Sequence, residues 1–181
     1  MDTPTVLDDW DSNFTAGRGG YTPVVIVDHI EAGTEAGTDT WFHNPASDVS
    51  SHYSVAKDGT IRKHVKVQDT AWACGVVDHP TATCVLAWFP NVNPNKYTVS
   101  IEHEGYPDDT MPEPQYQSTL WLHQQIIGEI GAPVDDDHII PHSSINADHA
   151  QCPGPTFPWA RLFSDLHAWQ ARAHPSAPSP V

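Results

Sequence analysis

The chain has few basic residues, and this scarcity limits the partners that it can bind. Only 8 of its 181 residues are Lys or Arg, against 23 Asp or Glu, so its formal net charge is −15 with histidine neutral. Binding to DNA or RNA depends on neutralising phosphates with cations, so no nucleic-acid partner is expected. The same imbalance disfavours nonspecific attachment to an anionic membrane or an anionic cell wall.

Long hydrophobic runs are also missing. No apolar stretch approaches the roughly 20 residues that span a bilayer, so no membrane partner is expected. The start, Met-Asp-Thr-Pro, has neither the positive charge nor the apolar stretch of a signal peptide. Cysteine is scarce at 3 residues, but a chain of this length buries enough surface to fold without a disulfide framework.

Histidine, in contrast, is abundant. The chain has 12 His, more than its Lys and Arg together. Imidazole changes charge near neutral pH and is a common metal ligand, so this density favours metal binding or acid–base chemistry.

The hydrophobic pattern predicts one α/β domain with a mixed β-sheet and flanking helices. Apolar alternation and turn residues predict strands at 24–27, at 97–104, and in a hairpin that joins 52–56 to 61–67 through Asp58-Gly59. Helical periodicity predicts helices at 115–130 and 158–171 and a short helix within 31–44, with a long loop at 76–96. We expect an N-terminal arm at 1–20, the domain at 21–172 and a Pro/Ser-rich tail at 173–181.

Four reactive side chains lie at the ends of these elements or in the loops between them. His29 ends the first strand, Glu102 lies on the strand at 97–104, and His142 and Cys152 are ten residues apart in a loop. Two imidazoles and one thiolate are a reasonable set of three ligands for a catalytic zinc, which keeps its fourth position for water. The spacing is not that of a zinc finger, and Cys152 before Pro153 is equally compatible with a small buried hydrophobic residue.

The sequence motifs that contain or surround these residues resemble those of a known family. The motifs, in family order, are Val27-Asp-His29, Ser50-Ser-His-Tyr53, Asp58-Gly-Thr-Ile61, Ala71-Trp72 with Gly75, Tyr97-Thr-Val-Ser-Ile-Glu-His-Glu-Gly105, His142, Cys152-Pro-Gly-Pro155 and Phe157-Pro-Trp159. Together they resemble the zinc-dependent N-acetylmuramoyl-L-alanine amidases shared by phage endolysins and peptidoglycan recognition proteins. The resemblance extends from about Val24 to Trp169.

This resemblance implies a mixed sheet flanked by helices, with an open groove above a Zn²⁺ ion. It implies that peptidoglycan is the substrate, cut between N-acetylmuramic acid and L-alanine. His29, His142 and Cys152 match the zinc ligands, and Glu102 matches the carboxylate that helps to activate water. Zinc lowers the pKa of its bound water to about 7, and a nearby carboxylate can move the proton to the leaving nitrogen.

Two positions depart from the family pattern. Many members have a lysine two residues before the ligand Cys or Asp, where this chain has Ala150 preceded by His149. We expect either that His149 supplies the missing positive charge, as a catalytic residue, or that zinc acts alone. Many relatives also have a histidine that lines the groove at the position of Ala73, so the sequence does not define the substrate contacts at this position. Strand alternation puts Glu104 on the same face as Glu102, although a solvated acid is the simpler interpretation of Glu104.

Other residues receive structural or binding roles. Trp72 is expected to contact substrate, because its motif lies beside the groove in relatives, whereas Trp41 and Trp88 are expected in the core. His52 is expected to pack or to form hydrogen bonds beneath the site. Cys74 and Cys84 are free to form a disulfide in an oxidising compartment, and the sequence leaves their redox state open.

Three functions compete at this point. The leading one is a zinc amidase that degrades bacterial cell walls, as an endolysin or autolysin, expected as a monomer. It would be made in the cytoplasm and reach the wall by holin-type release, by other export, or by secretion through an unrecognised route. The second is a recognition module that binds peptidoglycan without cutting it; such modules usually lack the cysteine ligand, which favours catalysis here. The third is an unrelated metal hydrolase that shares the ligands by coincidence.

Overall fold

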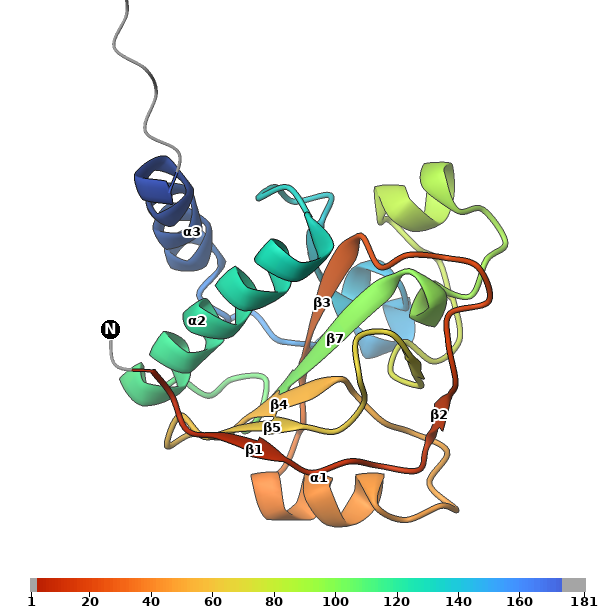
Figure 1. Ribbon diagram of the computed structural model, residues 1–181, viewed down its shortest axis with the longest axis horizontal. Coiled ribbons are helices and arrows are strands. Elements are labelled where there is room, and N and C mark those ends of the chain that lie inside the picture. Colours follow the sequence, from red (N-terminus) through yellow and green to blue (C-terminus); the bar gives the residue numbers. More distant parts are fainter. Residues whose placement is uncertain (1–2, 174–181) are drawn as a thin grey trace, which may run out of the picture.

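A six-stranded mixed sheet forms the centre of the protein, and helices cover both of its sides (Figure 1). The computed structural model describes residues 3–173. Strand order is β1 (Val6–Asp8), β5 (Ile61–Lys63), β4 (Tyr53–Val55), β7 (Thr98–His103), β3 (Val25–Ile30) and β8 (Ile139–Pro141). Only the β4–β5 pair is antiparallel, while the other pairs in this sheet are parallel. The α/β class predicted from the sequence is confirmed.

The central strand β3 is buried on both faces, as its β-branched run predicts. Ile26 packs on one side of the sheet with residues of α2 (Glu113–Ile130) and α3 (Trp159–Ala173). Val25 and Val27 pack on the other side, with Cys74, Cys84 and neighbouring residues. The alternation of side chains along the strand therefore divides the core into two layers.

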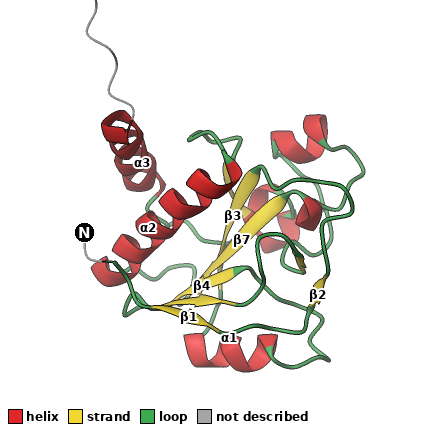
Figure 2. Cartoon of the chain, in the orientation of Figure 1, coloured by secondary structure: helices red, strands yellow, loops and turns green. Residues whose placement is uncertain are grey.

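The two long helices cover one face of the sheet (Figure 2). In α2, Tyr116, Leu120 and Ile127 face the core, and the helix ends at Gly131, whose φ of 70° is left-handed. In α3, Leu162 and Leu166 are fully buried against the same core. Both helices agree with the sequence prediction within two residues at each end.

The hairpin, the strand at 97–104 and the short helix are also confirmed, with narrower bounds. Strands β4 and β5 form the hairpin, β7 is the predicted strand, and α1 (Glu35–Phe42) lies beside the β1 edge of the sheet (Figure 1). Cys74 and Cys84, which are not among the proposed metal ligands, are buried free thiols, so the structure does not join them in a disulfide.

Several expectations need correction. The segment expected as an N-terminal arm contributes β1 to the main sheet, and β2 (Phe14–Thr15) pairs with β6 (Thr70–Ala71) in a small second sheet. The expected loop at 76–96 contains a π-helical turn at Cys84–Trp88 and a 3₁₀ turn at Pro94–Lys96. Strand β8 was not expected. Of the predicted tail, Ala173 ends α3 and residues 174–181 lie outside the described part of the chain.

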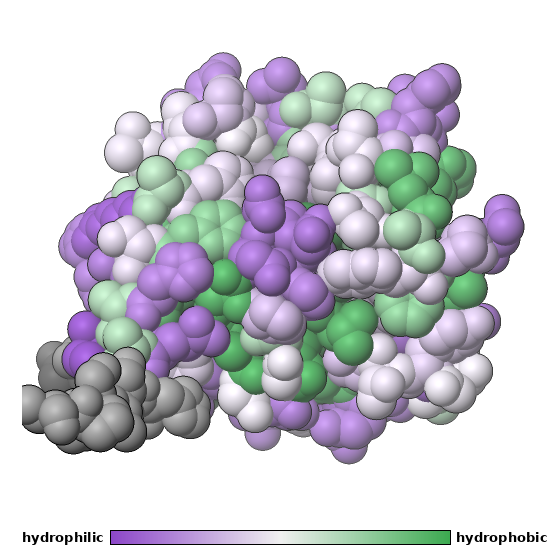
Figure 3. Space-filling model, turned by 90° about the horizontal axis from the view of Figure 1, so that it is seen from above, coloured by the Kyte–Doolittle hydropathy of each residue, from purple (hydrophilic) through white to green (hydrophobic). Residues whose placement is uncertain are grey.

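The surface mixes polar and apolar residues. On the face drawn in Figure 3, hydrophilic side chains are interspersed with smaller hydrophobic groups. Across residues 3–173, no helix combines the length and the apolar character that crossing a membrane would require.

Candidate active site

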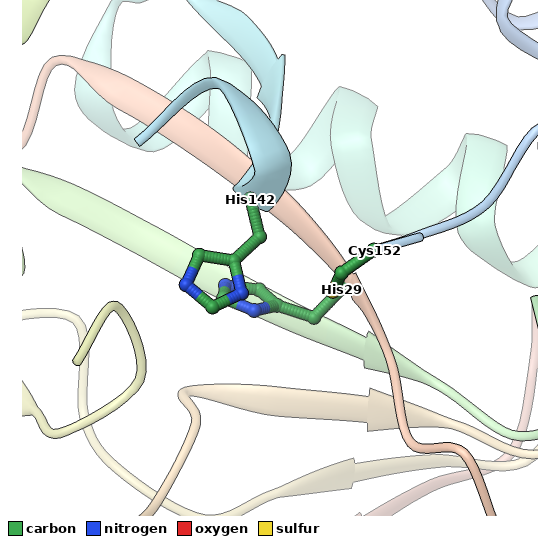
Figure 4. A group of neighbouring side chains, drawn as sticks. All are labelled: His29, His142 and Cys152. Atoms are coloured by element: carbon green, nitrogen blue, oxygen red, sulfur yellow. The ribbon is translucent and has the colours of Figure 1, made fainter. Parts of the chain in front are cut away.

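Three predicted ligands converge at one end of the central strands (Figure 4). His29 comes from β3, His142 begins the 3₁₀ turn His142–Ser144 directly after β8, and Cys152 lies in the following loop. One candidate donor atom from each residue lies within 4.8 Å of the others. Because β3 and β8 are paired in parallel, their carboxyl ends bring His29 and His142 to the same edge of the sheet.

The two imidazoles suit a metal ion. Nε2 of His29 is buried and has no hydrogen-bond partner in the described part of the chain. Nε2 of His142 lies 3.1 Å from the carbonyl oxygen of Cys74, which is an acceptor only, so this nitrogen donates and leaves Nδ1 unprotonated. Burial holds the pKa of His29 well below its ordinary value and lowers that of His142 to about 4, which keeps both rings neutral, as ligation requires.

The thiol needs a cation beside it to ionise. Burial, followed by the nearby Glu102 carboxylate, raises the pKa of Cys152 above its ordinary value. The backbone N–H of Ile30 donates a hydrogen bond to its Sγ at 3.4 Å, and this contact favours the thiolate. Two neutral imidazoles, one of them with an unpartnered ring nitrogen, and a buried sulfur are a donor set that fits zinc.

Glu102 connects this cluster to an open groove. The β3–β7 register places His29 directly beside Glu102, and Glu102 Oε1 lies 3.8 Å from His29 Nδ1. Burial, followed by the negative charge of Glu35, raises the pKa of Glu102 to about 8. Its neighbour Ile101 packs in the core on the opposite face, so the alternation predicted from the sequence is confirmed.

The groove has a volume of about 310 Å³ and runs along α1. Its lining includes Glu31, Trp41, Trp72, Ala73 and Glu102. The indole Nε1 of Trp72 donates to Thr15 Oγ1 at 3.0 Å, which fixes the orientation of this ring at the groove wall. Trp72 therefore lies where substrate contact was predicted.

His149 and Glu104 differ in position. His149 is exposed, and its ring stacks on His142 with centroids 4.6 Å apart. Glu104 lies away from this groove and accepts the backbone N–H of Lys57 at 2.7 Å. The structure thus brings His149 to the cluster and assigns Glu104 a local structural contact.

His52 forms structural hydrogen bonds, as expected. It is buried, its Nδ1 accepts the backbone N–H of Ser100, and its Nε2 is 2.8 Å from a guanidinium nitrogen of Arg18. The expectation that Trp41 and Trp88 are core residues is wrong. Trp41 is 54% exposed at the groove, and Trp88 is exposed and contacts the tilted ring of His138.

Sequence reasoning missed Glu31. This residue lines the groove two positions after His29, and both of its carboxylate oxygens are buried with no hydrogen-bond partner among the described residues. Burial, followed by the charge of Glu35, raises its pKa to about 9. The signal was available, because strand alternation places residues 29 and 31 on one side of the chain.

Comparisons with known proteins identify the family of this chain. The Amidase_2 family, described as N-acetylmuramoyl-L-alanine amidase, matches residues 19–155. N-acetylmuramoyl-L-alanine amidase A of Achromobacter lyticus is 25% identical over 84% of this chain and 87% of its own. A crystal structure of AmpD matches with a TM-score of 0.71 and 20% identity, over 91% of this chain and 94% of that one.

A third match carries a ligand. The amidase AmiD from E. coli, in complex with its substrate anhydro-N-acetylmuramic acid-L-Ala-D-gamma-Glu-L-Lys, aligns with a TM-score of 0.65 and 23% identity. The alignment covers 82% of this chain and 59% of AmiD. The family match spans well over half of the sequence, and the chain belongs to the N-acetylmuramoyl-L-alanine amidase family of enzymes.

Proposed function

We propose that the protein is a zinc-dependent amidase that cuts peptidoglycan between N-acetylmuramic acid and the L-alanine of the stem peptide. The observation that carries this proposal is the convergence of His29, His142 and Cys152 beside Glu102 at an open groove. Non-cutting recognition modules do not need a thiolate ligand next to a carboxylate base. The substrate in the AmiD complex supports a muropeptide as the ligand class.

The chain's own residues suit amide hydrolysis. Bound zinc would supply an activated water and a Lewis acid for the scissile carbonyl. The carboxylate of Glu102 then takes the proton of the nucleophile and delivers it to the departing nitrogen of L-alanine, because an amine leaves only when protonated. His149 donates to the oxyanion that develops on the carbonyl, a role that its stacking on His142 and its exposure to solvent support.

The groove residues position the substrate. Trp72 and Trp41 provide aromatic walls along which a sugar ring or an apolar part of the stem can lie. Ala73 leaves the groove wider than a histidine at this position would. We therefore assign Trp72 to substrate binding.

We further propose that the protein acts on the cell wall as an endolysin or autolysin and works as a monomer. Its release from the cytoplasm would use a holin-type system or another export route. The strong negative charge supports a role in which binding is specific to the groove rather than driven by surface attraction.

Mass spectrometry of digested peptidoglycan tests the proposal. Purified wall is incubated with the protein alone, with a zinc chelator, and with chelator followed by excess zinc. We expect free stem peptides that begin at L-alanine, lost on chelation and restored by zinc. Intact wall that retains bound protein would instead identify a recognition module, and cleavage that survives complete metal removal would exclude zinc dependence.

A further inference from the structure

A second group of metal-ligating side chains lies away from the active site, where the N-terminal segment meets α1 and the end of β5. Asp9 and Asp11 follow β1, Asp39 belongs to α1, and His64 follows β5. Single donor atoms of Asp9, Asp39 and His64 lie within 4.8 Å of one another. Asp11 joins them, because its Oδ2 is 3.5 Å from Nδ1 of His64.

The two innermost side chains present buried atoms that lack a hydrogen bond. The side chains of Asp11 and His64 are both 0% exposed. Within residues 3–173, no hydrogen bond reaches either carboxylate oxygen of Asp11 or the Nδ1 of His64. A buried charged or polar group without a partner is costly, so something other than protein is expected at this contact.

The hydrogen bonds of His64 define what it presents to the cluster. Ser54 Oγ donates its single proton to Glu35 Oε1 at 2.6 Å. Nε2 of His64 lies 2.9 Å from the same Oγ and must therefore carry the proton of that contact. Nδ1 is then a bare lone pair that faces the Asp11 carboxylate, and two acceptors at this distance need a cation or a proton between them.

Positive charge from the protein is insufficient here. Arg62 donates to Asp9 Oδ2 at 2.7 Å, but its Nε is 3.2 Å from Glu35, so its charge is shared with a fourth acid. His43 lies at the exposed side of the cluster, with Nε2 3.3 Å from Asp9 Oδ1. Its Nδ1 is 3.5 Å from Asp11 Oδ1 and 3.4 Å from Asp39 Oδ1, but it bonds the carbonyl oxygen of Asp39, so one imidazole is shared among three carboxylates. The three carboxylates of the cluster thus exceed the cations that reach them.

We propose that Asp9, Asp11, Asp39 and His64 form a second metal site, which binds Zn²⁺ or a similar first-row divalent ion. An imidazole nitrogen among carboxylates suits these ions, whereas Ca²⁺ and Mg²⁺ are normally held by oxygen alone. The ion fastens the N-terminal segment to α1 and to the strand hairpin. Since Trp41 and Thr38 of the same helix line the groove, this site also holds one groove wall in place.

Metal counting in matched variants tests the site without reference to amidase activity. The protein is stripped with a chelator, equilibrated with Zn²⁺ and analysed for bound metal by mass spectrometry. We expect two ions per chain in the wild type and in Asp108→Asn, which removes one exposed carboxylate elsewhere. Asp11→Asn and Asp39→Asn should each bind one, and Cys152→Ser should retain one at the second site.

Cobalt titration assigns the two ions to their sites. The ion held by Cys152 should give thiolate-to-metal charge-transfer absorption, and the other should add d–d bands alone. Asp39 is partly exposed on a helix, so Asp39→Asn is expected to fold even if Asp11→Asn does not. If a proton rather than a metal ion lies between Asp11 and His64, the wild type should bind one ion per chain. That result would overturn the proposal. Two ions in Asp39→Asn would overturn it as well.

Discussion

Single residues of the site depend on the register between two parallel strands. In the observed pairing, His29 of β3 lies beside Glu102 of β7, and both point to the groove side of the sheet. A slip of one residue would place Ile101 or His103 beside His29 and turn Glu102 toward the helices. The buried Val25–Val27 run fixes this register, because its apolar side chains fill both layers of the core.

Replacing a ligand and replacing the base should have different effects. Cys152→Ser should lose bound zinc and activity together, because a hydroxyl is a much poorer zinc ligand than a thiolate. Glu102→Gln should keep the fold and the zinc and lose turnover by about 100-fold or more, the usual contribution of a general base. Metal analysis and muropeptide assays measure both effects.

Glu104→Gln is the matched control for Glu102, since it removes a carboxylate from the end of the same strand. It should retain turnover. An active, zinc-bound Glu102→Gln protein would remove Glu102 from the mechanism.

His149 should affect turnover more than metal content. Its ring stacks on His142, but the hydrogen bond between His142 and the carbonyl of Cys74 remains when His149 is replaced. His149→Ala should therefore lower kcat by about 10-fold or more, with zinc stoichiometry unchanged. If Ala150→Lys, which restores the family's cation, recovers activity in the His149→Ala protein, the charge is the important property. If kcat is unchanged in His149→Ala, zinc stabilises the oxyanion without help from this residue.

His52 should make the folded state sensitive to acid. Burial, followed by the charge of Arg18, lowers the pKa of His52 to about 3, and protonation would place a donor against the Ser100 N–H. The unfolded chain takes up this proton near pH 6.5, so stability falls as pH decreases from about 6.5 toward 3. Chemical denaturation across this range measures the free energy of unfolding at each pH. In His52→Gln this free energy should depend less steeply on pH than in the wild type, by at most about 1.4 kcal/mol per pH unit. Identical slopes would show that other groups account for acid unfolding.

Whole elements could be predicted from the sequence wherever the hydrophobic pattern was long. The periodicity of Tyr116, Leu120 and Ile127 identified α2, and the alternation from Tyr97 to Glu104 identified β7. Strands β1, β2 and β8 have two or three residues each, which is too short for a period to appear. Their existence depends on partners far along the chain, such as the pairing of Val6 with Ile61.

The site was predictable for a different reason. Four reactive side chains lie on or between the strands, and their motifs resemble a family, so a metal-binding spacing was not needed to identify them: His29, Glu102, His142 and Cys152. Trp41 was assigned to the core because aromatic residues are commonly buried, but a helix beside a groove exposes one face. The contact of Asp11 with His64 joins residues 53 positions apart, which no local pattern encodes.

The loop that carries Cys152 should tolerate no side chain at Gly154. Gly154 has a φ of 111°, and a Cβ there would lie 2.7 Å from the Cα of Pro107. Gly154→Ala should therefore shift the loop, lower Tm and weaken zinc binding. Gly128→Ala in α2, with no atom within 4 Å of its Cβ, should be neutral or stabilising by up to about 1 kcal/mol. Equal zinc affinity and Tm in the two variants would contradict this account.

The charge of the whole molecule should shape its response to salt. A net charge of −15 repels anionic wall polymers, and salt screens this repulsion over a Debye length of about 8 Å at physiological ionic strength. Lysis of wall suspensions should therefore increase from low to physiological salt, while cleavage of a small soluble muropeptide should change much less. Turbidity and chromatography measure the two rates. A decrease of wall lysis with salt would indicate attraction instead.

The segment before the family match is part of the folding unit. The match begins at residue 19, yet β1 pairs with β5, Asn13 bonds four partners in the segment 42–49, and Arg18 donates to carbonyls of Val67 and Thr98. A chain shortened to the family boundary would leave β5 as an open edge strand, which is a template for aggregation. In this protein the evolutionary domain and the cooperative unit therefore have different boundaries.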